Sequence, residues 1–196
     1  MKPAAKPPSL LVMLRPDLDH LPELHLPPGY ELRPFRAGDQ AGWNAMVDLA
    51  FEREPGATSF AREMRSDPDF RPERVLVVVR EFEIAATASA WHLPEFGRQC
   101  GYLRWVATHP RHLGQKLGYN ASLGALHRMR TEKRTVAILK TDDYRGAAIR
   151  MYLALGFQPA PTEETHRARW KTVLKTLTWP ESLEHRIEGP LLKFPL

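Results

Sequence analysis

The stretch that decides the fold is TDDYRGAAIRMYLALGF, residues 141–157. A short apolar run at 136–140 precedes it, and its own apolar residues recur at helical spacing until a glycine ends the pattern. Glycine directly after the last periodic residue is typical of a helix C-terminus, because it adopts the left-handed conformation without strain. The stretch therefore predicts a buried strand at 136–140 and a helix over 144–155 that Gly156 closes.

A second stretch, WVATHPRHLGQKLG at 105–118, joins a strand over 101–108 to a helix over 114–133 through a turn that contains glycine. Such a turn presents free backbone N–H groups at a helix N-terminus, where the partial positive charge favours phosphate. The pattern predicts a diphosphate-binding turn. An ordinary strand-to-helix turn is the alternative that two glycines alone leave open.

The two stretches together resemble the GNAT (GCN5-related) N-acetyltransferase family. The last core helix of that family has alanine, tyrosine four residues on, and then a Gly-Phe pair, which here are Ala148, Tyr152, Gly156 and Phe157. Gly114 and Gly118 keep the first and last glycines of its cofactor motif. The resemblance covers about residues 29–157 and implies an α/β fold, with a central mixed sheet flanked by helices.

The resemblance also implies an activity: transfer of an acetyl group from acetyl-CoA to a primary amine, by direct attack and without a metal. The acceptor is a small molecule or a protein amino group, and Tyr152 is the general acid for the departing thiolate. The pantetheine arm is expected between the strand ending at Thr108 and the strand at 136–140. The expected coenzyme-binding residues are Val106, Ala107, Thr108, His112, Leu113, Gly114, Gln115, Lys116, Leu117, Gly118, Arg145 and Ala148.

Three of these residues depart from the family pattern. Leu113 stands where the family usually has a basic or amide residue, and Lys116 replaces its middle glycine. Lys116 either crowds the diphosphate or supplies it with a cation. Arg145 stands where asparagine is common, and it either reaches coenzyme oxygens or is a surface arginine.

The base that deprotonates the amine is not identified by the sequence, since a water chain serves as well as a side chain. His92 and Glu95 are candidates by position only. His109 and His112 flank the turn and either respond to phosphate charge or are simply exposed. Cys100 has no evident histidine partner, so a thiol nucleophile is not expected.

Composition narrows the class of protein. The 196 residues are 43% hydrophobic and 26% charged, which is typical of a globular chain, and one cysteine fits a reducing, cytoplasmic setting. No export signal is expected. The net charge is +5, with basic and acidic residues interspersed through most of the chain. A local basic patch at 128–134 is either a solvated helix end or a polyanion contact. A non-catalytic coenzyme-binding module and a nucleic-acid-binding protein are the alternative functions, and a homodimer is possible.

The expected organisation is a proline-rich arm at 1–28, the acetyltransferase domain at 29–178 and a tail at 179–196. Residues 10–14 of the arm are expected to add an edge strand. Asp39 is expected to cap a helix over 39–51, and Thr165 or a residue nearby is expected to cap a helix that holds Trp170 and Leu177. The acceptor is expected near aromatic residues that are mostly core: Tyr30, Trp43, Phe51, Trp91 and Trp105. The remaining predicted elements are strands at 30–35, 75–79 and 84–91 and a helix at 58–65.

Overall fold

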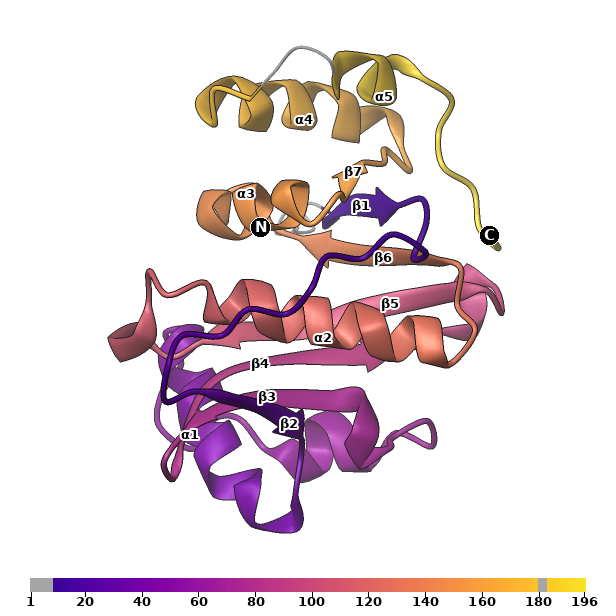
Figure 1. Cartoon of the computed structure of the whole chain (residues 1–196). Coiled ribbons are helices and arrows are strands. Elements are labelled where there is room, and N and C mark those ends of the chain that lie inside the picture. Colours follow the sequence, from indigo (N-terminus) through magenta and orange to yellow (C-terminus); the bar gives the residue numbers. More distant parts are fainter. Residues whose placement is uncertain (1–8, 180–182) are drawn as a thin grey trace, which may run out of the picture. The chain divides into compact units, whose positions relative to one another are not determined.

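The computed structural model describes residues 9–179 and 183–196, so Pro3, Pro7, Pro8 and Pro180 of the expected arm and tail lie outside the described residues. The chain divides into two compact units. The larger holds residues 15–138 and 194–196, and the smaller holds the described residues before Arg15 and those from Leu139 to Lys193. Each unit is built on strands (Figure 1).

The larger unit contains the β-rich half that the sequence predicts. Its strand order is β2-β3-β4-β5-β6, antiparallel up to β5, with β6 parallel to β5. The β-branched run of β3 explains its burial, because such side chains pack well on a pleated surface. The strands are β2 Glu31–Pro34, β3 Val75–Arg80, β4 Glu83–Trp91, β5 Cys100–Thr108 and β6 Val136–Thr141.

Strand β5 is irregular at Trp105. There the backbone has φ +53°, and the pairing with β4 slips between Thr87 opposite Ala107 and Ser89 opposite Arg104. The slip places one extra residue in β5, which is a β-bulge. On its other side β5 pairs with β6 only from Cys100 to Tyr102, so its second half lies beyond that ladder. The sequence reasoning predicted the strand and missed the bulge.

Helices cover both faces of this sheet. Helix α1, Gln40–Ala50, buries Trp43 and Val47 against the core, and a short π-helical segment, η2 Ala61–Arg65, follows it. Helix α2, Leu117–Thr131, lies on the near face in Figure 1 and α1 on the far face. Burial of β4 along nearly its whole length follows from this double cover.

The smaller unit places β1, Leu11–Arg15, between β6 and β7, Gln158–Pro159. The predicted strand at 10–14 is confirmed, but its assignment as an edge strand is wrong. Leu11, Val12 and Met13 are all at most 3% exposed, as expected of an interior strand with apolar residues on both faces. The helices are α3 Gly146–Ala154, α4 Glu164–Thr176 and α5 Glu184–Glu188.

Two predicted caps differ in the structure. Asp39 precedes α1, but its carboxylate accepts from the Arg33 guanidinium and the Arg36 N–H and makes no capping bond to α1. Helix α4 has Glu163 at its N-cap position, two residues before Thr165, and no side chain makes a capping bond there. None of the helices in the described part of the chain is long and apolar enough to cross a membrane.

Candidate functional site

The turn after β5 is the first candidate region. It contains the 3-10 segment η5, Pro110–His112, and then two residues with left-handed backbone, Gly114 at φ +80° and Lys116 at φ +56°. These left-handed residues explain why α2 begins at Leu117 and not at 114 as predicted. No atom lies within 4 Å of the position that a Gly114 Cβ would take, so the backbone at this position is open to a ligand.

The turn exposes its backbone in front of a 15-residue helix. Leu113 is 65% exposed and Lys116 is exposed, while Leu117 is buried and anchors the helix start. The Asn120 side chain donates to the Lys116 carbonyl at 3.0 Å and accepts from the His25 N–H at 3.0 Å, which fixes this end of α2. Free N–H groups here, with the helix dipole, suit an anion such as a diphosphate.

Most of the predicted coenzyme residues are in the larger unit. The Lys116 ammonium pairs with no carboxylate among the described residues, which leaves it available as a cation. The residues that the structure brings together at the end of β5 and the start of α2 are Val106, Ala107, Thr108, His112, Leu113, Gly114, Gln115, Lys116, Leu117 and Gly118.

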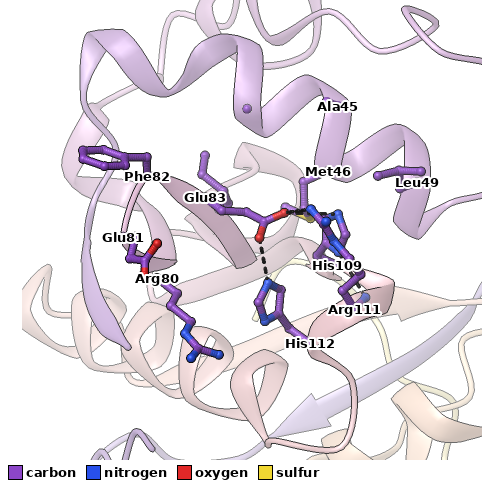
Figure 2. Close-up of a pocket in the computed structure, with 12 residues that line it drawn as sticks. Ala45, Met46, Leu49, Arg80, Glu81, Phe82, Glu83, His109, Arg111 and His112 are labelled. Carbon is purple, nitrogen blue, oxygen red and sulfur yellow. Dashed lines mark hydrogen bonds and ion pairs between the residues drawn. The ribbon is translucent and has the colours of Figure 1, made fainter. Parts of the chain in front are cut away.

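A carboxylate that the sequence did not single out holds this turn. Glu83, at the start of β4, accepts from His112 Nε2 at 3.0 Å and from the Arg111 guanidinium, and His109 Nε2 lies 3.6 Å away (Figure 2). The hydrogen bond from His112 is the largest cause that holds the pKa of Glu83 below its usual range. We call Glu83, His109, Arg111 and His112 the Glu83 cluster. His109 and His112 are buried, so the expectation of simply exposed histidines is wrong.

The hydrogen bonds fix the tautomers of both histidines. His109 Nδ1 accepts from the Arg111 N–H at 3.1 Å, so its proton is on Nε2. Since a carboxylate only accepts, His112 donates through Nε2, and its Nδ1 accepts from the Tyr30 hydroxyl at 2.8 Å. Glu83, His109 and His112 lie close enough to hold a metal ion, within 4.8 Å of one another. With both Nε2 atoms protonated, the arrangement is that of a hydrogen-bonded cluster centred on the carboxylate.

A pocket of about 660 Å³ opens beside the Glu83 cluster. Helix α1 forms one wall with Met46 and Leu49, and the turn between β3 and β4 forms another with Arg80 and Phe82 (Figure 2). Phe82 is fully exposed and Leu49 is 53% exposed. The pocket thus combines apolar side chains with the polar cluster.

The second candidate region is the end of α3 in the smaller unit. Gly156 has φ +82°; its N–H donates to the Leu153 carbonyl at 2.9 Å, and the Phe157 N–H donates to the Tyr152 carbonyl at 3.0 Å. This pair of bonds is the Schellman motif, and the accompanying apolar contact joins Tyr152 and Phe157, with ring centroids 6.1 Å apart. The spacing of Tyr152, Gly156 and Phe157 therefore has a structural cause. Tyr152 is 7% exposed.

Arg145 lies just before α3, which begins two residues later than predicted. Its Nε donates to Asp142 at 2.8 Å, and its guanidinium also contacts the Tyr144 side chain. Burial lowers the pKa of Arg145, but the hydrogen bonds and charges of Asp142 and Tyr144 together outweigh it, so the pKa is raised. The arginine is therefore held locally, and Ala148 follows it half-buried on α3.

The other candidate side chains occupy separate places in the larger unit. Burial raises the pKa of the Cys100 thiol to about 12, as expected of an unreactive cysteine. Burial lowers the pKa of His92, whose Nδ1 lies 3.9 Å from Asp69, while Glu95 is exposed. In the basic patch, Arg128 Nε donates to the Glu132 carboxylate at 2.8 Å, and this pair is part-buried.

The comparisons agree with this architecture. The family model described as "Acetyltransferase (GNAT) family" matches residues 43–157, more than half of the chain. A mycothiol acetyltransferase of Thermobispora bispora is 29% identical over 157 residues, which cover 74% of this chain and 52% of that protein. The chain spans about half the length of the curated relatives it matches.

Solved structures show the same fold. A GCN5-related N-acetyltransferase from Sphaerobacter thermophilus matches with a TM-score of 0.57 and 23% identity, covering 77% of this chain and 48% of that one. The NatC complex bound to Gag peptide and CoA matches with a TM-score of 0.53 and 15% identity, covering 64% of this chain and 82% of that one. The fold is thus of the acyltransferase class with a mixed α/β sheet. The chain belongs to the GNAT acetyltransferase family.

Proposed function

We propose that this protein transfers the acetyl group of acetyl-CoA to a primary amine. The observation that carries the proposal is the exposed turn at 113–116, which ends β5 at the N-terminus of α2, in a chain whose family is acetyltransferases. Open backbone at Gly114 favours the diphosphate of the coenzyme, and so does the Lys116 ammonium, which has no carboxylate partner in the part of the chain that the structure describes.

The second half of β5 supports a role for its backbone. Because its ladder with β6 ends at Tyr102, the edge at Val106 and Thr108 is suited to pair with an extended pantetheine arm, as an added strand would. A backbone N–H near Val106 or Ala107 would then polarise the thioester carbonyl. The bulge at Trp105 turns this part of the strand and sets which groups face the arm.

Tyr152 is the residue to which we assign the proton for the coenzyme A thiolate. The assignment rests on the family resemblance, since its burial and its place in the Schellman motif are equally expected of a packing residue. Deprotonation of the acceptor amine is left to a water chain or to His92, whose lowered pKa keeps the imidazole neutral.

Thiol release from acetyl-CoA tests the proposal across a panel of small amines, amino acids and peptides. Because curated relatives are named mycothiol acetyltransferase, the panel includes the acceptor of that enzyme. We expect release that depends on one class of amine, with the acetylated amine identified by mass spectrometry. Binding of acetyl-CoA without transfer to any amine would instead favour a coenzyme-binding module.

A further inference from the structure

Arg104, in the middle of β5, has more N–H donors than the described residues around it supply with hydrogen-bond acceptors. Its side chain is 22% exposed, and its guanidinium lies 5.1 Å from the Trp91 ring and 5.7 Å from the Trp105 ring. A guanidinium has five N–H donors. Among the described residues its one hydrogen bond goes to the Glu63 carbonyl, at 3.3 Å.

The nearest carboxylate does not accept a hydrogen bond from the Arg104 guanidinium. Asp67 Oδ2 forms an ion pair with the guanidinium at 4.0 Å, beyond hydrogen-bond distance, and accepts from Trp91 Nε1 at 2.9 Å. Burial is the main cause that lowers the pKa of Arg104, and the nearby charge of Asp67 only partly opposes it. Arg104 therefore retains donors for an additional acceptor.

A second donor next to it is also unsatisfied. The indole N–H of Trp105 is buried and has no hydrogen-bond partner within the described part of the chain. Arg53 adds positive charge to the same place, with its guanidinium 5.6 Å from the Trp105 ring. Two neighbouring donors without acceptors, in a positively charged and aromatic setting, suit a planar anionic group.

We propose that Arg104, with Trp105, binds a carboxylate of the acceptor, so that the favoured substrates are amines that also carry a carboxylate. This inference rests on the proposed function. Arg104 is two residues before Val106, across the bulge at Trp105, so their backbones are at most about 7 Å apart. A carboxylate held at Arg104 therefore leaves an amine a few bonds away near the backbone to which the thioester is assigned.

The test compares acceptors in matched pairs, each an amino acid and its amide, by kcat/KM for the wild type and for Arg104→Gln. For each enzyme we take the ratio of kcat/KM for the amino acid to kcat/KM for its amide. Comparing this ratio between the variant and the wild type cancels the intrinsic reactivity of each amine. We expect Arg104→Gln to lower kcat/KM for the amino acid about 10- to 100-fold and to leave the amide nearly unchanged. Arg62→Gln, which removes an exposed arginine beside Glu63, is the matched control and should keep the wild-type ratio.

Arg104→Lys keeps the charge without the planar fork, and we expect an intermediate ratio. It also provides the comparison if Arg104→Gln does not fold, which thermal unfolding would show. An equal loss for amino acid and amide in Arg104→Gln would overturn the inference. This result would leave the proposed function intact, whereas a wild type that acetylates no amine overturns both.

Discussion

At the scale of single residues, Tyr152 has two roles to separate. Its ring and backbone close α3, and its hydroxyl is the assigned acid. Tyr152→Phe keeps the ring that closes α3 and removes the hydroxyl, so we expect a folded protein with a kcat lower by about 100-fold, the usual contribution of a general acid. Steady-state kinetics with a competent amine give this value. A Tyr152→Phe enzyme with wild-type kcat would remove the assignment.

Glu83 is a positioning residue in this account, because it contacts the turn and not the reacting atoms. Glu83→Gln loses the charge that attracts Arg111 and two imidazoles, which loosens the turn. We expect the KM for acetyl-CoA to rise several-fold with little change in kcat. Its neighbour Glu81, exposed in the same hairpin, is the control: Glu81→Gln should change neither constant. A fall in kcat with unchanged KM would contradict the positioning role.

These residues differ in whether the sequence alone could predict them. Tyr152 and Gly156 were predictable, because they lie within one helix and its cap. Glu83 was not, since 26 residues of chain separate it from His109 and only the pairing of β4 with β5 brings them together. Arg104 was missed for the same reason: its shortage of partners is a property of packing around it and leaves no local pattern.

At the scale of elements, close packing of α2 on β5 makes a sharp prediction. A Cβ at Gly101 would lie 2.4 Å from Met129 Sδ and 2.8 Å from its Cγ, so Gly101→Ala forces this side chain to move. We expect a loss of about 1–3 kcal/mol in the free energy of unfolding, measured by urea denaturation. Gly38→Ala, where nothing lies within 4 Å, should lose far less. Equal effects of the two variants would contradict the described packing.

The elements themselves were largely predictable from periodicity and turn residues. Strands β3 to β6 and helices α1 to α4 were all expected close to where they lie. The bulge in β5 and the interior place of β1 were not, because each depends on which strands become neighbours. Sequence pattern gives the period of one strand but not its partners.

At the scale of the whole molecule, buried histidines make stability depend on pH. Burial is the main cause that lowers the pKa of His92, His109 and His166 from the ordinary 6.5. The unfolded chain therefore binds more protons than the folded one once the pH falls below about 6.5.

We expect the free energy of unfolding to be level above about pH 7 and to fall as the pH drops through 6.5 towards the folded-state pKa values. Urea denaturation at a series of pH values measures this. His166→Gln removes one of these buried histidines and should reduce the slope. Stability that rises on acidification in this range would show that the histidines are charged in the folded state.

The account as a whole depends on the turn between β5 and α2 as the place where the coenzyme diphosphate binds. Calorimetry with acetyl-CoA and with acetyl-pantetheine, which lacks the diphosphate and the adenosine 3′-phosphate attached to it, measures the contribution of that half of the coenzyme, and Lys116 at the turn tests the share of the diphosphate. We predict that acetyl-CoA binds at least tenfold more tightly, and that Lys116→Ala narrows the difference. Equal affinity for the two thioesters would contradict the account.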